Sequence, residues 1–402
     1  MADEPRIPRR LNFSRCSTIN EASSGRKLMK AEKQTPLLGL TLAELTEFAE
    51  RAGQPPYRGR QLFEALYRQR VESAEQISTL PQGFRDSFGE RGFPLGTSRI
   101  QKKFVSTDGT VRYLIGFEDG QSVETVWMPE GDGGETGDGS EAGDEESRTA
   151  ARAWDRATIC VSSQVGCAVD CQFCLTALLG VKRNLSAGEM VGQICTVLND
   201  QHVSPPQDRV NIVFMGMGEP FLNYENFMKA VGLLVEGVGI PASRMTVSTA
   251  GIVPRIYDLG LEPVRPKLAI SLNASNDELR TTLMPINRKW NLEKLVAAAR
   301  DFPLRNRERL TFEYVLMDGV NDSTTHAREL GELIRGVRAK VNLIALNPGP
   351  RIAFQTPVAE RVINFQKILT NAGIPAFIRR PRGRDIYAAC GQLKRTVELA
   401  AV

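Results

Sequence analysis

Hydrophobic residues recur along the second half of the chain with two alternating patterns. Short runs rich in Val, Ile and Leu predict buried strands at residues 158–162, 210–215, 245–248, 268–272, 310–316, 341–346 and 376–378. Between them, apolar residues three or four positions apart predict helices at residues 189–198, 224–235, 278–283, 292–299, 325–337 and 358–371. Strands and helices that alternate in this way build a parallel sheet, so residues 154–402 are expected to form one α/β domain.

About six strand–helix units are enough for an incomplete (β/α)6 barrel, and such folds bind ligands at the C-terminal ends of their strands. We expect segments 167–174 and 217–220 at this edge, together with Ser248, Asn273 and Asn347. Glycine lets the backbone approach a ligand closely, and a carboxylate accepts hydrogen bonds from an ammonium group. Taken singly, each of these positions is more typical of an ordinary turn.

The first 129 residues show different patterns. Residues 1–35 are polar and basic with little periodicity, which predicts a disordered arm. In residues 36–95, a capping box from Thr41 to Glu44 opens the first of three short helical patterns, so a small helical accessory module is expected. Residues 96–129 alternate with period two around an Asp119-Gly120 turn, which predicts a β-hairpin.

Residues 130–153 are rich in Gly, Asp and Glu, which predicts an acidic, disordered insertion. Eight acids and no Lys or Arg lie within residues 130–147, so removing them from the net charge of +4 leaves +12 for the rest of the chain. A basic body suits a polyanionic partner such as RNA, because neutralised phosphates release counterions. Most basic surfaces are merely solvated, so charge alone only favours RNA slightly.

The composition restricts the class of protein further. Hydrophobic residues make up 42% of the chain, a normal value for a globular core. No apolar run reaches the length of about 18 residues that a membrane span needs, and no secretory signal opens the chain. Seven cysteines, three of them clustered, indicate a reducing compartment rather than a disulfide framework, and we therefore expect a cytoplasmic protein.

The three clustered cysteines are Cys167, Cys171 and Cys174, directly after a predicted strand. A set of thiolates alone selects zinc or an iron–sulfur cluster. A structural zinc site normally has four protein ligands, but His202 and His326 do not lie at ligand spacing from this loop. Three cysteines favour a 4Fe–4S cluster whose fourth iron is open to a substrate. Packing of three small apolar residues by coincidence is the weaker alternative.

The cysteine motif resembles the signature of radical S-adenosylmethionine (SAM) enzymes. With residues 160–167, 216–220 and 385–393 it is similar to the RlmN family of RNA adenine methyltransferases, over residues 37–394. The resemblance implies an enzyme that uses one 4Fe–4S cluster and two SAM molecules per turnover. Its implied substrates are carbon 2 of a specific adenosine in 23S rRNA and of adenosine 37 in some tRNAs. It also implies a reducing protein such as flavodoxin, and we expect a monomer without membrane contact.

The resemblance assigns roles to individual residues. Cys390 takes a methyl group from one SAM, Cys160 removes the carbon 2 proton and resolves the adduct as a disulfide with Cys390, and Glu124 accepts a proton. The cluster ligands carried over are Cys167, Cys171 and Cys174, and the SAM-binding residues carried over are Gly218, Glu219, Ser248, Ser271, Leu272, Asn273 and Asn347. Asn273 stands where the family has His, and its amide keeps a donor and an acceptor but cannot titrate.

The chemistry of the acceptor explains why a radical is needed. Carbon 2 of adenine lies between two ring nitrogens and is electron-poor, so it does not attack a SAM methyl group as a nucleophile. A reduced 4Fe–4S cluster reaches the low potential that cleaves SAM to a 5′-deoxyadenosyl radical. That radical would take a hydrogen from S-methylated Cys390, and the resulting methylene radical would add to adenine. Arginines at positions 379, 380, 382 and 384 would attract RNA phosphates and favour the Cys390 thiolate.

Two alternatives remain at this stage. Enzymes of the Cfr type, within the same family, methylate carbon 8 of adenine instead of carbon 2. A non-catalytic RNA-binding protein with a structural metal belongs to a different class and would bind zinc without cleaving SAM. An optical spectrum after anaerobic reconstitution separates an iron–sulfur enzyme from the second alternative.

The acidic insertion generates the first prediction. A variant that lacks residues 131–150 should bind RNA more tightly, because the acidic residues no longer compete with RNA for the basic surface. The measurement is RNA affinity at fixed salt concentration, with a neutral Gly-Ser replacement of the same length as the control for loop length. Unchanged affinity in both variants would reject the competition.

Overall fold

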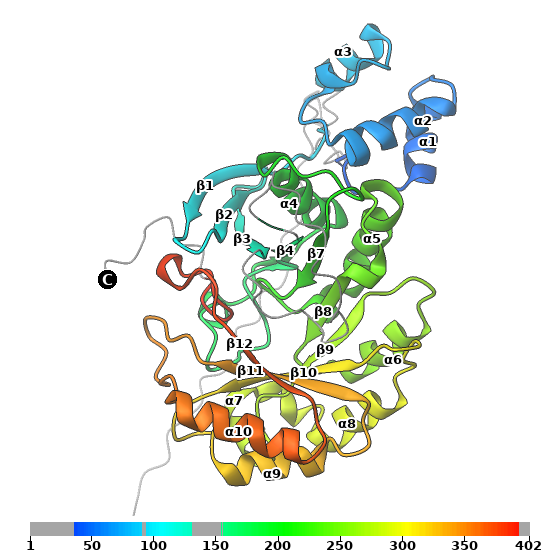
Figure 1. Cartoon of the computed structure of the whole chain (residues 1–402). Coiled ribbons are helices and arrows are strands. Elements are labelled where there is room, and N and C mark those ends of the chain that lie inside the picture. The colour runs from blue at the N-terminus through cyan, green and yellow to red at the C-terminus, as the bar shows by residue number, and fades with distance from the viewer. Residues whose placement is uncertain (1–35, 91–93, 131–153, 155, 394–402) are drawn as a thin grey trace, which may run out of the picture. The chain divides into compact units, whose positions relative to one another are not determined.

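The computed structural model describes residues 36–90, 94–130, 154 and 156–393 (Figure 1). The predicted basic arm at residues 1–35 lies outside this described part. The same holds for the acidic insertion except Glu130, and for residues 394–402.

The described strands form one ten-stranded sheet in the order β1-β2-β3-β4-β7-β8-β9-β10-β11-β12, and a separate two-stranded ribbon joins β5 (Gln164–Val165) to β6 (Arg183–Asn184). Seven neighbours in the large sheet run parallel: β4 (Arg156–Cys160), β7 (Val210–Phe214), β8 (Met245–Thr249), β9 (Lys267–Ser271), β10 (Leu310–Leu316), β11 (Ala339–Ala345) and β12 (Ala376–Arg379). Each matches a strand predicted from the apolar runs.

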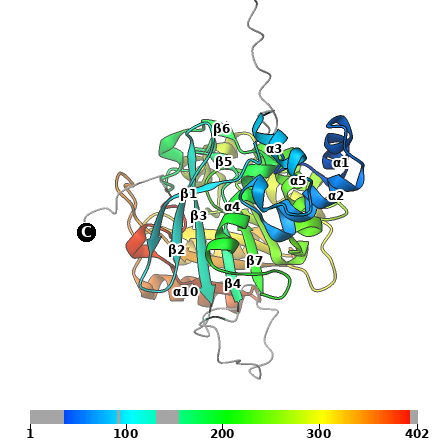
Figure 2. The ribbon, with the colours of Figure 1, turned by 90° about the horizontal axis from the view of Figure 1, so that it is seen from above.

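Antiparallel strands extend this sheet on one side. They are β1 (Arg99–Val105), β2 (Val111–Gly116) and β3 (Ser122–Glu130), and β3 pairs with β4. Figure 2 shows them beside one another and continuing into β7. The predicted hairpin is formed by β2 and β3. The structure corrects the prediction in one respect, because β1 adds a third strand and the whole extension is continuous with the α/β sheet.

Six strand–helix units follow one another from β4 to β11. Their helices are α4 (Ala187–Asp200), α5 (Tyr224–Leu233), α6 (Val253–Leu261), α7 (Asp277–Leu283) with α8 (Leu292–Asp301), α9 (Thr324–Leu333) and α10 (Ala359–Asn371). Among the described strands, β1 and β12 are the two edges and do not pair with each other. The predicted open, incomplete (β/α)6 barrel is therefore confirmed.

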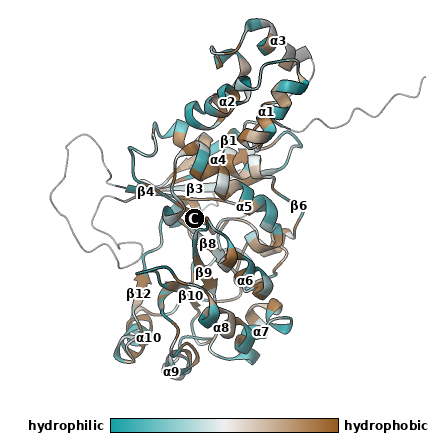
Figure 3. Ribbon diagram, turned by 90° about the vertical axis from the view of Figure 1, so that its right-hand side faces the viewer, coloured by the Kyte–Doolittle hydropathy of each residue, from teal (hydrophilic) through white to brown (hydrophobic). Residues whose placement is uncertain are grey.

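Strand periodicity decides which residues face the helices and which face the interior. Phe214 of β7 packs against Phe227 of α5, with ring centroids 4.9 Å apart, and Tyr314 of β10 packs against Phe365 of α10 at 5.2 Å. Successive residues of a strand point to opposite faces, so Glu313, next to Tyr314, faces away from the helices. The central strands are mostly hydrophobic, whereas the helices are mixed (Figure 3).

The predicted helical module is present before the sheet. It contains α1 (Leu42–Arg51), α2 (Tyr57–Phe63), which continues as a π-helix over Glu64–Gln69, a short turn at Ala74–Gln76 and α3 (Gln82–Glu90). The predicted capping box is confirmed: Glu44 N donates to Thr41 Oγ1 at 3.3 Å, and Thr41 N donates to Glu44 Oε2 at 2.7 Å. Glu44 also pairs with Lys229 of α5, which joins the module to the α/β domain. None of the helices in the described ranges is both long and apolar enough to cross a bilayer.

A buried ion pair before β9 generates a prediction about stability. Arg265 and Glu308 are 3% and 6% exposed, and Arg265 Nη1 donates to Glu308 Oε1 at 2.9 Å. Glu308→Gln should destabilise the fold by about 3–5 kcal/mol, because it leaves a buried guanidinium without its carboxylate. Glu332→Gln, which breaks the exposed pair with Arg335, is the matched control and should cost about 0–1 kcal/mol. Equal shifts of the two variants in urea unfolding would contradict this.

Candidate active site

The polar residues expected at the strand ends lie at one edge of the parallel sheet. Loops after β4 and β7 meet where Glu219 N donates to Gln164 Oε1 at 3.0 Å. The β7 loop meets the end of β8 where Ala250 N donates to Glu219 Oε2 at 2.7 Å. Strands β8 and β9 meet where the hydroxyl oxygens of Ser248 and Ser271 are 3.2 Å apart. These contacts join three of the predicted ligand-binding segments into one site.

The cysteine loop follows the end of β4 and packs on an apolar cluster. Val169 and Phe173 belong to this cluster, and Cys167 and Cys171 pack against it. Its other buried members are Ala250, Leu283, Met284, Met317 and Leu346. The main chain also supplies hydrogen bonds to sulfur, because the amides of Ala168 and Val169 donate to the Cys167 thiol. N–H donors and a dry surround are the features that tune the potential of an iron–sulfur cluster.

The charges of this loop fit a bound metal cluster. Burial, aided by the charges of Glu219 and Cys174, raises the pKa of Cys167 to about 12. Burial also raises the pKa of Cys171 well above its usual value, as do the two neighbouring cysteines. Three thiolates here therefore require positive charge, which metal ligation supplies. In the described part of the chain, no three His, Cys, Asp or Glu side chains converge on a single ion position. A cluster in which each sulfur binds a separate iron fits this set of three thiols.

Glu219 is a buried carboxyl held by the backbone around it. It accepts hydrogen bonds from Ala250 N at 2.7 Å and from Phe221 N at 3.0 Å, and it is 3% exposed. Burial raises its pKa to about 7, although these hydrogen bonds oppose the rise. Gly218 before it has φ +98°, and a Cβ there would lie 2.6 Å from the Cβ of Gln164. Only glycine fits this approach of the β7 loop to the β4 loop.

The segment after β9, Leu272 and Asn273, is buried, and the Asn273 side chain is hydrogen-bonded within the protein, which the sequence did not predict. Leu272 is fully buried, and Asn273 is 2% exposed with φ +58°. The Asn273 amide uses both of its groups internally, because its Oδ1 accepts from Val315 N at 2.9 Å and its Nδ2 donates to Met284 Sδ at 3.2 Å. Asn tolerates the left-handed backbone better than most residues, which gives a structural reason for its presence.

Asn347 differs from Asn273 in the hydrogen bonding of its side-chain amide. It follows β11 by two residues and is 5% exposed. Among the described residues no hydrogen bond of its side-chain amide is found, and its amide atoms are not among the fully buried polar atoms that lack a partner. An amide in this state is suited to bind a ligand.

Cys160 and Cys390 lie close enough for their charges to interact, although 229 positions separate them. The loop of Cys390 joins the cysteine loop where Leu175 N donates to Gly391 O at 2.8 Å, and Cys390 also interacts electrostatically with Cys174. Burial raises the pKa of Cys160 above its usual range. Cys390 is exposed as a residue, but the protein atoms around its thiol still raise its pKa; Glu313 adds to the rise and Arg379 opposes it.

Glu124 lies on β3 and is fully buried in an ion pair with Arg112 of β2. The guanidinium of Arg112 lies over the ring of Phe104, 4.1 Å from its centroid. Glu124 stands two positions from Val126, which is the register partner of Cys160, so both side chains face the interior of the sheet. The structure therefore brings the predicted proton acceptor to the same face as Cys160.

Sequence reasoning missed two buried charged residues here. Arg112 is fully buried between the apolar neighbours Val111 and Tyr113, and Glu313 is 9% exposed and accepts a hydrogen bond from Asn342 Nδ2 at 2.9 Å. A charged residue inside an otherwise apolar strand is the signal that could have identified both, because such residues are rarely buried without a partner.

Reciprocal hydrogen bonds also went unpredicted, between the β1–β2 turn and the segment before Cys390. Gly383 N donates to Asp108 Oδ2 at 2.9 Å, and Ser106 Oγ donates to Asp385 Oδ1 at 2.6 Å. The hydrogen bond from Gly383 is the strongest of several that lower the pKa of Asp108, against an opposing effect of burial. We refer to this pair of contacts as the aspartate latch. It connects the antiparallel extension to the arm that carries Cys390.

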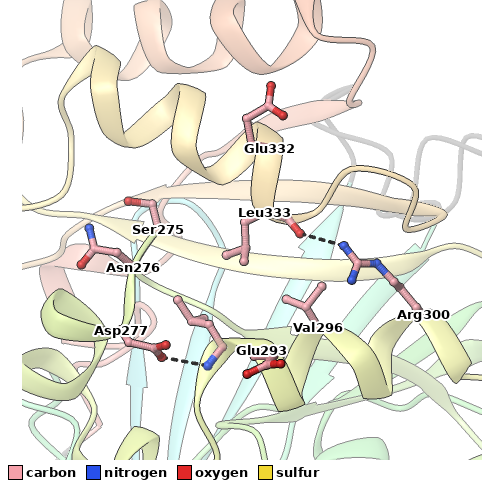
Figure 4. A pocket seen from close by; sticks show the side chains of 9 residues that line it. Ser275, Asn276, Asp277, Glu293, Val296, Arg300, Glu332 and Leu333 are labelled. Atoms are coloured by element: carbon pink, nitrogen blue, oxygen red, sulfur yellow. Dashed lines mark hydrogen bonds between the residues drawn. The ribbon is translucent and has the colours of Figure 1, made fainter.

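A cavity of about 520 Å³ lies elsewhere, between α8 and α9 on the helical layer (Figure 4). Its lining includes Asp277, whose carboxylate accepts from Leu292 N at 2.8 Å, and Arg300, which donates to Leu333 O at 3.3 Å. None of its lining residues is a predicted site residue. The cavity is therefore separate from the cysteine site.

Comparisons with known proteins show what the chain is similar to. Residues 161–330 match the model of the radical SAM superfamily. The chain is 67% identical to the probable dual-specificity RNA methyltransferase RlmN of Koribacter versatilis, over 86% of this chain and 98% of that protein. It is 45% identical to the dual-specificity RNA methyltransferase RlmN of Syntrophobacter fumaroxidans, over 88% and 96%. A crystal structure of a radical SAM methyltransferase from Sphaerobacter thermophilus superimposes with a TM-score of 0.80 at 44% identity, over 90% of this chain and 99% of that one.

The pKa of Glu219 predicts how a substitution will depend on pH. The folded pKa, about 7, exceeds the usual value of 4.5, so the neutral carboxyl stabilises the fold fully below about pH 4.5 and this contribution is lost as the pH rises through 7. Glu219→Gln cannot ionise, but it loses one acceptor. The variant should therefore be less stable than the parent at about pH 5, and the difference should shrink by up to about 3 kcal/mol at pH 8.

Urea unfolding of cluster-free protein at the two pH values measures this difference. Glu332→Gln, on an exposed helical surface, is the control and should show no comparable pH dependence. A stability difference that stays constant or widens between pH 5 and pH 8 would contradict the assigned pKa.

Proposed function

Since this chain belongs to the RlmN family of dual-specificity RNA methyltransferases, we propose that it methylates carbon 2 of adenine in 23S rRNA and in adenosine 37 of some tRNAs. The observation that carries the proposal is the hydrogen bond from Leu175 N to Gly391 O, which holds the Cys390 loop beside the cysteine loop, within electrostatic range of both Cys160 and Cys174. A methylation that passes through the protein needs one thiol to carry the methyl group and a second thiol within reach to release the product.

In this proposal the cofactors are held by the strand-end residues. Cys167, Cys171 and Cys174 hold one 4Fe–4S cluster, which, once bound, supplies the electron that splits SAM at its sulfonium. Glu219 and the neighbouring Gly218 hold the amino group of SAM. The remaining SAM contacts are assigned to Ser248, Ser271, Leu272, Asn273 and Asn347. The unpaired amide of Asn347 and the hydroxyl pair of Ser248 and Ser271 support this assignment most directly.

In this proposal Asn273 does not bind SAM through its side chain. Its side chain already bonds Val315 and Met284, so it positions the segment after β9 and contributes to SAM binding through the backbone. This position tolerates Asn in place of His because no imidazole titration is needed for such a role.

The two remote cysteines perform the transfer. Cys390 Sγ accepts a methyl group from a first SAM. The 5′-deoxyadenosyl group of a second SAM would then take one hydrogen atom from this methyl group, and the carbon left on the sulfur would become bonded to carbon 2 of adenine, with the odd electron returned to the oxidised cluster. Cys160 removes the carbon 2 proton and forms a disulfide with Cys390, which releases methylated RNA. Glu124 is the further proton acceptor, and its buried pairing with Arg112 favours the ionised form that this role requires.

RNA and a reducing protein are the proposed partners. Arg380 and Arg384 are exposed within the basic run that precedes Cys390, where they can neutralise phosphates beside the target adenosine. A flavodoxin-like protein would reduce the cluster and reopen the disulfide between turnovers. We propose that the enzyme acts as a monomer.

Two cysteine variants test the proposal. Cys390→Ala should abolish methyl loading of the protein, and Cys160→Ala should leave RNA covalently attached to the enzyme, because the second thiol that releases the product is missing. Intact-protein mass spectrometry and denaturing gels measure the two effects. Cys195→Ala, a buried residue of α4 outside the site, is the control and should retain turnover.

The same reactions decide the position of methylation. Nucleoside mass spectrometry of the product should show 2-methyladenosine. Either 8-methyladenosine, or methylated product released at normal yield by the Cys390 or Cys160 variant, would refute the assignment.

A further inference from the structure

Arg280 is a fully buried cation on α7, beside the cysteine loop. It makes no salt bridge within the described residues, in contrast to the other buried arginines Arg112 and Arg265, which pair with Glu124 and Glu308. Its helix contacts the cysteine loop, because Gln172 N donates to Leu283 O at 3.0 Å. Cys171 lies within electrostatic range of the guanidinium, as does Asp277 at the start of the same helix. An arginine buried without a carboxylate partner is rare and costly, because the charge has lost its water.

The guanidinium is held by neutral oxygens. Nη2 donates to Ala250 O at 2.7 Å and to Ser271 O at 3.1 Å, and Nε donates to Leu272 O at 3.0 Å. Nη1 donates to Asn287 Oδ1 at 2.9 Å. Four hydrogen bonds therefore engage the fork of a side chain that has five N–H donors. This leaves no pair of parallel N–H donors for a bidentate contact with a ligand carboxylate. Arg280 therefore contributes its positive charge at a fixed position and does not bind a carboxylate itself.

The carbonyls that it binds belong to the cofactor site. Ser271 and Leu272 close β9, and Ala250 follows β8. Ala250 is held from both sides, since its N–H donates to the buried carboxyl of Glu219 and its carbonyl accepts from Arg280. Gly251 completes the fit: it has φ +108°, and a Cβ there would lie 3.4 Å from Arg280 Nη2. The charge is thus locked in place by the strand ends that bind SAM in the proposed function.

No carboxylate of the described residues forms a salt bridge with Arg280, so its charge can act on a cluster held by the neighbouring Cys171. Burial lowers the pKa of Arg280 to about 10, which leaves the side chain protonated at neutral pH. Three thiolates on a 4Fe–4S core with two positive charges give a net charge of −1, and one-electron reduction makes it −2. A fixed cation therefore stabilises the reduced cluster more than the oxidised one.

We propose that Arg280 is a positioning residue whose buried charge makes the cluster easier to reduce. The inference rests on the proposed cluster site at Cys167, Cys171 and Cys174. It does not depend on the identity of the RNA or on the position methylated. Arg280 thereby has two effects that can be separated, a geometric effect on the strand ends and an electrostatic effect on the cluster.

The test is a redox titration of the anaerobically reconstituted, full-length protein without RNA, followed by the optical and electron paramagnetic resonance signals of the cluster. Arg280→Gln should lower the ratio of reduced to oxidised cluster at least tenfold at a fixed potential, equivalent to a shift of about 59 mV to more negative values for one electron. Arg280→Lys keeps the charge and should stay within twofold of the parent. Arg335→Gln removes an exposed arginine beyond α9 and is the control, also within twofold.

SAM affinity separates geometry from charge. Both Arg280 variants lose the planar fork, so an equal loss of SAM affinity in the two reports the carbonyl contacts, whereas only Arg280→Gln should shift the potential. A parent-like potential in Arg280→Gln, or an equal shift in Arg280→Lys, would overturn the proposal.

If Arg280→Gln does not fold or retain iron, the Arg280→Lys variant decides. A ratio of reduced to oxidised cluster within twofold of the parent supports the proposal, and a tenfold loss overturns it. If the protein methylates no RNA, the proposed function fails, while this titration still tests Arg280.

Discussion

Three sulfurs that must carry negative charge inside an apolar pocket are the constraint on which the rest of the site depends. Cys167 and Cys171 pack on an apolar cluster, and burial raises the pKa of both thiols. Apolar side chains cannot offset such a charge, so the compensation has to come from metal, from backbone N–H groups and from a fixed cation. The cysteine loop, the β7 loop with Glu219 and the helix that carries Arg280 are arranged around this requirement.

The two faces of the sheet differ in composition: one packs against helices, and the other carries polar side chains. The face toward the helices is apolar and supplies the packing, as the contacts of Phe214 and Tyr314 show. The other face carries Cys160, Ser271, Glu313 and Glu124, which are polar or reactive. The antiparallel extension continues this second face beyond β4. It places the carboxyl of Glu124 on the same face as Cys160, a group that the six strand–helix units alone would not provide.

The sequence was sufficient for every parallel strand and for the location of the site, because both depend on local patterns. Apolar runs identify buried strands, and parallel strands bring their ends to one edge whatever the details of packing. Cys167, Glu219 and Asn347 could be placed for this reason. Arg280 could not, because an Arg in an amphipathic helix normally faces solvent, and only tertiary packing shows that this one is buried. The hydrogen bond from Val315 N to the Asn273 side chain likewise arises from a contact between distant segments.

The aspartate latch limits how far the sulfur of Cys390 can travel. Asp385 is anchored to the β1–β2 turn five positions before this cysteine, and Gly391, directly after it, is anchored to Leu175. Five residues span at most about 18 Å even when fully extended, and the short tether on the other side restricts the thiol much more. A large swing between two distant binding places is therefore excluded while both anchors hold. In the proposed function, the sulfonium and the nucleobase would therefore approach a nearly stationary sulfur one after the other.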